Sequence, residues 1–285
     1  MLRIAIPSSG RIRMESLSLL EKVGVKINKS DENVLLARST DFPAEVAFVE
    51  KNNTLKWVLD GLADVCICSE FSLVSCEVSH EQVIRKLGFG KVTLSLLVPY
   101  DTKYDGLRWF SNRVVATPYP NILQQFFKSN GVKSTVRPMY EHVYRSVNAH
   151  VADAVMDIVY SGTSLIAERL REVEKVFSSE AVMVVSNIIT PSQRLILDEL
   201  LSRIDSVIAA QSKKFVSMNV PADKLERISE LLPSLCSQNI SRLMDPNWMS
   251  ISTVMDETRL WDIVEKLRML GVREIIACPI DNLIL

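Results

Sequence analysis

The chain has 285 residues, of which 47% are hydrophobic and 24% are charged, with a formal net charge of −1. This length and composition are typical of a globular protein with two or three compact units. The near-zero charge gives no reason to expect a nucleic acid or a membrane as partner, and no apolar run approaches the roughly 18–20 residues of a membrane span.

The first part of the chain alternates strands with helices. Strands are predicted at residues 2–6, 44–50 and 63–69, and helices at residues 11–23 and 54–62. The last of these strands carries Cys66 and Cys68 on one face, which is not the spacing of zinc ligands. The cysteines therefore favour a reduced, cytoplasmic protein.

The same order of elements then returns. Strands are predicted at residues 113–117, 134–139 and 152–159, and helices at residues 122–131 and 144–151. Aligning Ala63-Asp64 with Ala152-Asp153 pairs the two halves element for element, which indicates a weak internal repeat of two α/β lobes. Strands that alternate with helices predict parallel sheets, with ligands at the carboxyl ends of the strands in a cleft shared by the lobes.

The remainder of the chain changes character. A strand at residues 181–189 and a long amphipathic helix at residues 189–211 come first. The order of strands and helices that follows, from residue 214 to residue 280, is β-α-β-β-α-β, the ferredoxin-like pattern. Such a unit suits a dimerisation module and an effector-binding domain about equally well.

The loop Ser161-Gly162-Thr163-Ser164 follows a strand and opens onto a predicted helix in LIAERLREVE. A helix start offers unpaired N–H groups and partial positive charge, Gly162 permits close approach, and hydroxyls can donate to phosphate oxygens. The same residues also suit an ordinary helix N-cap. Asp153 and Asp157, four apart on the preceding strand, are expected on one face at its carboxyl end, where acids suit ribose hydroxyls or a magnesium ion on a diphosphate.

Residues 157–164 resemble the phosphoribosyl-diphosphate signature of the ATP phosphoribosyltransferase family, the first enzyme of histidine biosynthesis. In that signature an apolar strand carrying Asp precedes a [ST]-G-x-T-[LM] loop, and here Ser164 replaces the final Thr. The resemblance covers nearly the whole chain and is similar to the long form with a carboxyl-terminal regulatory domain. It extends through LRIAIPSSGR, GLADVCI, LGFGKVTLSLLVP, ATPYPNIL, MNVPADKLERISELLP and KLRMLGVREIIACPIDNLI.

The resemblance implies two α/β lobes like those of type II periplasmic binding proteins, followed by a ferredoxin-like domain that binds histidine as feedback inhibitor. The first lobe is expected at residues 1–97 and 181–210, the second at 98–180, and the regulatory domain at 211–285. The implied reaction is the displacement of diphosphate from phosphoribosyl diphosphate by N1 of ATP, with Mg²⁺, giving N1-(5-phosphoribosyl)-ATP. A homo-oligomer, dimer or hexamer, is implied as well.

The resemblance also implies roles for individual residues. Binding of the 5′-phosphate is expected from Ser161, Gly162, Thr163 and Ser164, binding of ribose or Mg²⁺ from Asp153 and Asp157, and binding of nucleotide or diphosphate from Gly10, Arg11 and Tyr119. No residue is assigned as a catalytic acid or base. Packing at a helix start is an equally good interpretation of Tyr119.

The chain departs from the family pattern mainly at cleft turns. Ser8 stands where the K-x-G-R turn has Lys, and both glycines of D-L-G-I-x-G are replaced, by Cys66 and Ser69. Tyr144 replaces an acid that the family places near the ribose, and His150 replaces a glycine. An active enzyme would compensate with other groups, for which the candidates are His142, Arg145 and Arg169.

Three functions therefore compete. The first is ATP phosphoribosyltransferase of the long type. The second is a paralogue that keeps the fold and binds a phosphate ligand or histidine but has lost or changed the reaction. The third, a solute-binding protein, fits the lobes but does not explain the carboxyl-terminal domain, and residues 1–6 do not form an export signal.

Overall fold

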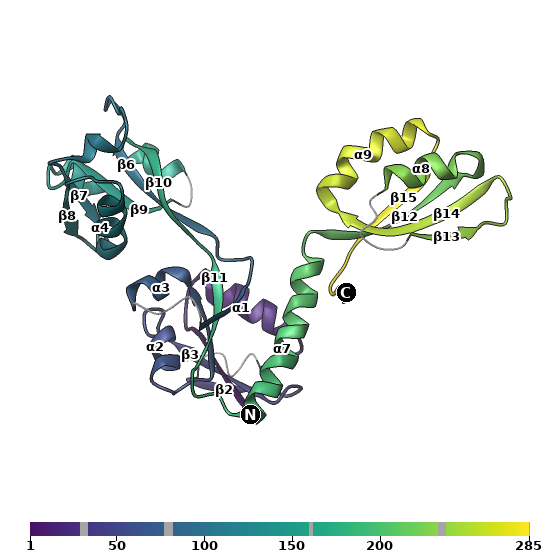
Figure 1. Cartoon of the computed structure of the whole chain (residues 1–285), viewed down its shortest axis with the longest axis horizontal. Coiled ribbons are helices and arrows are strands. Elements are labelled where there is room, and N and C mark those ends of the chain that lie inside the picture. The colour runs from purple at the N-terminus through teal and green to yellow at the C-terminus, as the bar shows by residue number, and fades with distance from the viewer. Residues whose placement is uncertain (29–33, 77–81, 160–161, 233–237, 285) are drawn as a thin grey trace. The chain divides into compact units, whose positions relative to one another are not determined.

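The computed structural model describes residues 1–28, 34–76, 82–159, 162–232 and 238–284, with the side chains of residues 75 and 162–164 left aside. Its chain forms two compact units (Figure 1). One unit comprises Met1–Glu21 and Val25–Ile196, and the other comprises Lys22–Gly24 and Leu197–Leu285.

The first sheet of the first unit has the strand order β2-β3-β1-β4-β11-β5. Its strands are β1 (Leu2–Pro7), β2 (Leu36–Arg38), β3 (Ala44–Val49), β4 (Val65–Ser69), β5 (Val83–Lys86) and β11 (Ala181–Val185). The helices that accompany it are α1 (Arg11–Lys22), α2 (Thr54–Leu59) and α3 (Glu70–Ser75). Leu55, Val58 and Leu73 pack α2 and α3 against one face of this sheet, and α1 places Arg13 over the Phe48 ring on the other, 5.2 Å from its centroid.

The second sheet has the order β10-β6-β9-β7-β8. Its strands are β6 (Val92–Pro99), β7 (Val114–Thr117), β8 (Thr135–Pro138), β9 (Ala154–Val159) and β10 (Leu170–Ser179). A 3₁₀ turn, η3 (Leu107–Phe110), and the helices α4 (Pro120–Ser129), α5 (Arg145–Asn148) and α6 (Gly162–Ala167) connect these strands. The order matches β5-β11-β4-β1-β3 of the first sheet, so the predicted repeat of two α/β lobes is confirmed.

Three expectations about this unit were wrong. The sheets are mixed, because β11 runs antiparallel to β4 and β6 runs antiparallel to β9. β6 pairs wholly within the second sheet, so residues 92–97 belong to the second lobe and not to the first. The helix after the loop at residues 161–164, called the phosphate loop below for its expected ligand, ends at Ala167, since Arg169 adopts a left-handed φ of 53° and β10 begins at Leu170.

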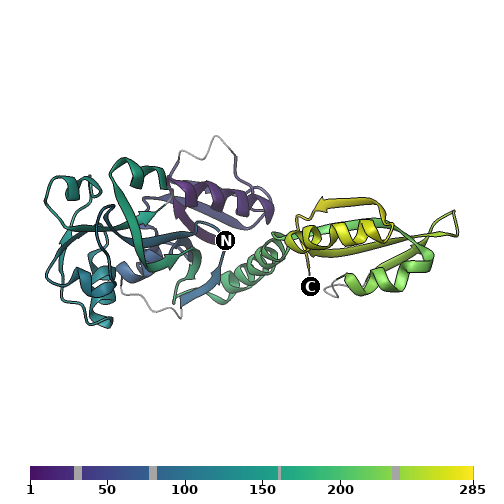
Figure 2. The ribbon, with the colours of Figure 1, turned by 90° about the horizontal axis from the view of Figure 1, so that it is seen from above.

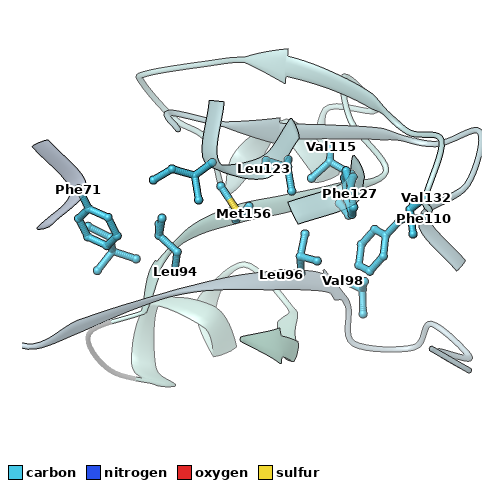
Figure 3. Packing of buried hydrophobic residues seen from close by; sticks show 13 residues of the cluster. Phe71, Leu94, Leu96, Val98, Phe110, Val115, Leu123, Phe127, Val132 and Met156 are labelled. Carbon is cyan, nitrogen blue, oxygen red and sulfur yellow. The ribbon is translucent and has the colours of Figure 1, made fainter. Parts of the chain in front are cut away.

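The two lobes share a hydrophobic core at their junction. Phe71, from α3 of the first lobe, belongs to the cluster that fills the second lobe (Figure 3). Its ring centroid lies 5.4 Å from those of Tyr119 and Phe177. Aromatic side chains bury more apolar surface than any others, and tilted ring pairs add to that stabilisation. Phe71 therefore anchors one lobe to the other.

Polar contacts join the same segments. The Ser69 and Ser179 hydroxyls lie 2.8 Å apart. The Lys86 ammonium lies 3.0 Å from a carboxylate oxygen of Glu70 and 3.5 Å from one of Glu180. Because β5 leads into β6 and β10 leads into β11, these contacts clamp both places where the chain passes between the lobes.

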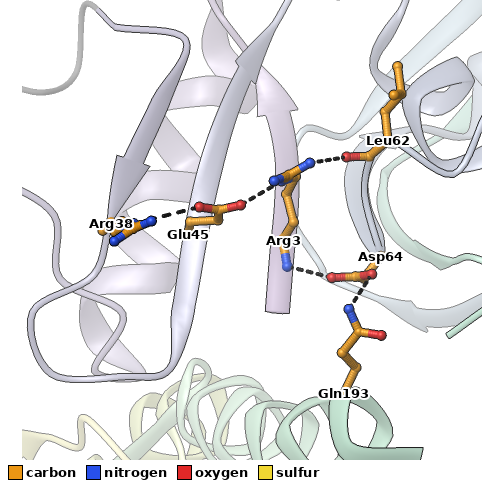
Figure 4. A network of polar contacts seen from close by, with 6 residues as sticks. All are labelled: Arg3, Arg38, Glu45, Leu62, Asp64 and Gln193. Atoms are coloured by element: carbon orange, nitrogen blue, oxygen red, sulfur yellow. Dashed lines mark hydrogen bonds and ion pairs between the residues drawn. The ribbon is translucent and has the colours of Figure 1, made fainter. Parts of the chain in front are cut away.

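The two lobes also share an equivalent aspartate that makes the same hydrogen bonds in each. The Asp64 carboxylate accepts a 2.7 Å hydrogen bond from the Arg3 N–H, and its own N–H donates to the Arg3 carbonyl at 3.0 Å (Figure 4). Asp153 makes the same pair of bonds with Val114, at 2.7 and 2.8 Å. Each aspartate precedes its strand and ties it to the neighbouring strand, which accounts for the Ala-Asp repeat in the sequence.

The second unit is built on a four-stranded antiparallel sheet of order β13-β14-β12-β15. Its elements are β12 (Lys213–Pro221), η4 (Ala222–Lys224), α8 (Leu225–Leu231), β13 (Asn239–Arg242), β14 (Trp248–Asp256), α9 (Glu257–Met269) and β15 (Arg273–Pro279). Ile228 of α8 and Leu260, Ile263 and Leu267 of α9 join one core with this sheet, and Figure 2 shows α9 lying against it. The predicted ferredoxin-like order is confirmed.

The helix α7 (Pro191–Ala210) begins in the first unit and continues into the second from Leu197 onward. Its buried residues include Leu200 and Ile204, as expected of the amphipathic helix predicted here. Arg203, on the same helix, donates to the Val23 carbonyl at 3.0 Å. None of the helices in the described ranges is long and apolar enough to cross a membrane.

We expect Asp64→Ala to lower the free energy of unfolding by about 1–3 kcal/mol, because the Arg3 N–H and the Gln193 amide, 2.8 Å away, both lose an acceptor. Asp153→Ala should cost less, since its carboxylate is exposed and the described contacts give it a single main-chain donor. Urea unfolding measures both, with the exposed Asp60→Ala as control. An Asp64 variant as stable as the Asp60 variant would contradict the assignment.

Candidate active site

The loops at the carboxyl ends of the strands come together at a cavity between the lobes. It is lined by Pro7, Ser9, Gly10, Arg11, Ile12, Lys51, Ser69, Phe71, Gly90, Val92 and Ile158. Residues from β1, from β4 and from the turn after β3 in one lobe thus meet the first residue of β6 and the end of β9 in the other. Two of the residues expected at the site, Gly10 and Arg11, lie in this lining.

The first turn is held close to the end of β3. The Ser8 N–H donates to the Val49 carbonyl at 2.7 Å. Gly10 has a φ of 87°, a conformation that glycine adopts freely and other residues rarely do, so this turn favours glycine at position 10. Arg11 starts α1 and lies 3.1 Å, Nε to Oε1, from Glu15 one turn later, with its side chain largely exposed.

Lys51 is a cavity residue that the sequence prediction missed. It lies in the turn directly after β3, a segment whose local pattern predicts only a connection to the next helix. Its place immediately after a strand of a parallel pair is the signal that could have identified it, because ligands bind at the carboxyl ends of such strands.

Ser69 occupies a position at which the family pattern has glycine. Its hydroxyl accepts a bond from the Phe71 N–H at 3.4 Å and contacts Ser179 at 2.8 Å. It therefore caps α3 and takes part in the clamp between the lobes. The side chain that replaced glycine here strengthens the junction, while the residue still lines the cavity.

Tyr119 is placed for packing. It precedes α4, and its N–H donates to the Thr117 hydroxyl at 3.0 Å. Its ring packs against Phe71 within the second-lobe core. Tyr119 is not part of the cavity lining, although Phe71 is. Its expected contact with nucleotide stays a prediction.

The expectation that Asp153 lies beside Asp157 at the carboxyl end of the strand was wrong. Asp153 precedes β9, at its amino end, and its carboxylate is bonded to the first residue of β7. The spacing of four residues spans most of a six-residue strand, so the two carboxylates lie toward opposite ends. The position of Asp153 therefore does not fit a role in binding ribose or Mg²⁺.

Asp157 is half-buried near the carboxyl end of β9, close to Tyr144. The Tyr144 hydroxyl donates to the Ile158 carbonyl at 2.9 Å, and Asp157 itself accepts from the Ile158 N–H at 2.7 Å. Burial raises the pKa of the Asp157 carboxyl above its ordinary value, and the hydrogen bonds from Ile158 and Tyr144 partly offset that increase.

The phosphate loop begins where β9 ends. Ser161 lies outside the described residues, and for Gly162, Thr163 and Ser164 only the main chain is described, at the start of α6. This places the loop at the carboxyl end of a strand, as expected. Contacts of these four residues with a phosphate stay a prediction.

Two of the cations considered as compensating groups are already paired. Arg145 lies 3.3 Å from Glu168, and Arg169 lies 3.0 Å from Asp101, each measured from guanidinium nitrogen to carboxylate oxygen. An ion pair offsets the charge of its guanidinium. Neither arginine therefore replaces the positive charge that the family lysine would supply at position 8.

His142 and His150 both have left-handed backbone conformations, with φ of 51° and 54°. This accounts for the glycine that the family pattern has at position 150, since glycine adopts positive φ without steric cost. Both histidines lie in turns on either side of α5 and are exposed. Neither lines the cavity described above.

Comparison with known proteins gives concordant results over the whole chain. A family model described as ATP phosphoribosyltransferase matches residues 51–206, and one described as the HisG C-terminal domain matches residues 210–282. The ATP phosphoribosyltransferases of Bacteroides fragilis and Phocaeicola vulgatus are 41% identical to it over 285 residues, covering 100% of both chains. That of Cytophaga hutchinsonii is 34% identical, covering 99% of this chain and 98% of its own.

A solved structure supports the fold. The ATP phosphoribosyl transferase (HisG:HisZ) complex from Thermotoga maritima aligns with a TM-score of 0.59 at 22% identity. The alignment covers 72% of this chain and 96% of that chain. At this identity the likeness establishes the fold and not the activity.

The raised pKa of Asp157 makes a prediction about stability. The folded state holds its proton more tightly than the unfolded state, so the contribution of Asp157 to stability is present below the ordinary aspartate pKa and is lost as the pH rises through the raised value. We therefore expect Asp157→Asn to be more stable than the parent protein at pH 7 and to lose this part of the pH dependence.

Urea midpoints between pH 4 and pH 8 measure this effect, with Asp60→Asn at an exposed position as the matched control. An Asp157→Asn protein that is less stable than the parent at pH 7 would show that the hydrogen bonds outweigh the cost of burying the charge.

Proposed function

The chain belongs to the ATP phosphoribosyltransferase family, and from that premise we propose that it condenses ATP with phosphoribosyl diphosphate to give N1-(5-phosphoribosyl)-ATP and diphosphate. The observation that carries the proposal is the cavity to which both lobes contribute the carboxyl ends of their strands. Full-length identity of 41% to curated members of the family supports it.

In this reaction the protein contributes mainly by positioning the substrates and stabilising the charge that develops. Displacement of diphosphate from C1 of the ribose by N1 of ATP develops positive charge on the sugar and negative charge on the leaving group. In the proposal, Ser161, Gly162, Thr163 and Ser164 bind the 5′-phosphate at the end of β9. Asp157 faces the ribose, while Gly10 and Arg11 bind phosphate oxygens from the opposite lobe.

Magnesium fits this arrangement as an ion carried by the substrates. The described residues contain no group of three or more His, Cys, Asp or Glu side chains that could hold a metal by themselves. Mg²⁺ is commonly bound by one or two carboxylates together with substrate phosphates. In the proposal Asp157, near the carboxyl end of β9, contributes a carboxylate, and the ion would neutralise charge on the departing diphosphate.

A second candidate is a paralogue that binds a phosphate ligand without turnover. The observation that favours it is Tyr144, whose hydroxyl contacts the end of β9 where the family pattern has an acid. A phenol can supply one hydrogen bond there but no carboxylate. The loss of that negative charge weakens stabilisation of an oxocarbenium-like ribose.

A coupled assay for diphosphate release with ATP, phosphoribosyl diphosphate and Mg²⁺ tests the first candidate. We expect turnover by the parent protein and a loss of about a hundredfold or more in Ser161→Ala/Thr163→Ala, because the phosphate loses its hydroxyl donors. Ser129→Ala/Thr135→Ala, with the same composition change at exposed positions of the second lobe, is the matched control.

The enzyme proposal is contradicted if the parent protein turns over no faster than the loop variant. Calorimetry with phosphoribosyl diphosphate alone then separates the two remaining states. Binding that the loop variant abolishes identifies a non-catalytic binder, whereas no binding by either protein identifies a cleft that has lost this ligand.

For the ferredoxin-like unit we propose binding of histidine as feedback inhibitor, within a homo-oligomer. The support is its β-α-β-β-α-β order together with the family match over residues 210–282. We expect L-histidine to release or absorb heat on titration into the full chain and to lower turnover, with D-histidine as the control ligand. Equal responses to the two enantiomers would contradict a specific site.

A further inference from the structure

The charged residues that line the cavity between the lobes are all positive. Among the described residues that line it, Arg11 and Lys51 are the charged ones, and no carboxylate accompanies them. Two cations that line one cleft raise the local concentration of anions more than the same groups apart on an open surface. The lining therefore selects an anionic ligand.

Lys51 differs from Arg11 and from the two arginines considered as compensating groups in its lack of a carboxylate partner among the described residues. Arg145 and Arg169 are each paired with a carboxylate, and the Arg11 Nε contacts Glu15. Lys51 makes no ion pair with any residue in the described ranges. Of the two cations in the cavity lining, Lys51 is thus the one that no carboxylate in the described ranges contacts.

Lys51 lies close along the chain to the residues of β3 that pair with the Pro7–Ser8 turn, where Ser8 replaces the family lysine. Pro7 of β1 and Val49 of β3 are partners in the parallel register, and the Ser8 N–H donates to the Val49 carbonyl. Lys51 follows Val49 by two residues. A lysine side chain from the end of β3 therefore enters the same cavity as the turn in which Ser8 replaces the family lysine.

We infer that Lys51 binds the oligophosphate chain of an anionic substrate together with Arg11, and that it supplies from β3 the ammonium missing at position 8. This inference rests on the proposed function for the identity of the substrates. Its chemistry, a flexible ammonium and a forked guanidinium on phosphate oxygens, is shared by the triphosphate of ATP and the diphosphate of phosphoribosyl diphosphate.

Calorimetry on the full chain tests the inference with three separate probes: ATP, phosphoribosyl diphosphate and inorganic tripolyphosphate. We expect Lys51→Gln to weaken binding of at least one probe by about tenfold, as for the loss of one charge-assisted contact. Lys56→Gln, on the exposed face of α2 five residues away, is the matched control and should stay within about twofold.

A double variant provides the decisive comparison. If the ammonium has moved from position 8 to position 51, Ser8→Lys should restore binding in the Lys51→Gln background. Weaker binding of ATP and tripolyphosphate assigns Lys51 to the nucleotide, and weaker binding of phosphoribosyl diphosphate alone assigns it to the leaving group. Unchanged urea midpoints exclude unfolding as the cause.

Failure of the inference and failure of the proposed function are distinguishable. A parent protein that turns over, and whose kcat/KM and ligand affinities are unaffected by Lys51→Gln, overturns the inference and leaves the function standing. A parent protein that does not turn over, but binds a probe through Lys51, supports the inference and removes the function. A parent protein that binds none of the three probes overturns the inference.

Discussion

The clamp between the two lobes is the constraint on which the candidate site depends. Phe71 packs from the first lobe into the core of the second, while the Ser69–Ser179 contact and the Lys86 ion pairs with Glu70 and Glu180 hold the two places where the chain crosses. Apolar burial supplies the larger share of the stability, and directional polar contacts fix the geometry. Without this junction the carboxyl ends of the two sheets would not meet at one cavity.

The internal repeat explains why two lobes of different sequence can form such a cavity. Both sheets have the same strand order, and in each an aspartate ties one strand to its neighbour by two main-chain contacts. That aspartate serves the amino edge of the sheet. The cavity is lined from the opposite edge, where the residues differ between the lobes.

The residues that depart from the family pattern have different structural roles. Ser69 became part of the lobe junction, and His150 occupies a left-handed conformation that the family pattern fills with glycine. Tyr144 contacts the strand end that carries Asp157, and its hydrogen bond lowers the pKa of that carboxyl against the effect of burial. Arg145 and Arg169 pair with acids of their own lobe. For Ser8, the compensating positive charge is the one that the inference above assigns to Lys51.

The sequence by itself determined the elements, the two-lobe repeat and the ferredoxin-like order, because period-2 and period-3.6 patterns and glycine stops are local properties of the chain. It also placed Gly10, Arg11 and the phosphate loop at strand ends. Only the tertiary structure decided that LREVEKVFSS is a strand, that Asp153 serves the opposite end of the sheet, and that Lys51 enters the cavity. These three depend on antiparallel pairing with β6, on strand length and on contacts between distant segments. A local pattern does not encode them, because the partners are brought together only when the chain has folded.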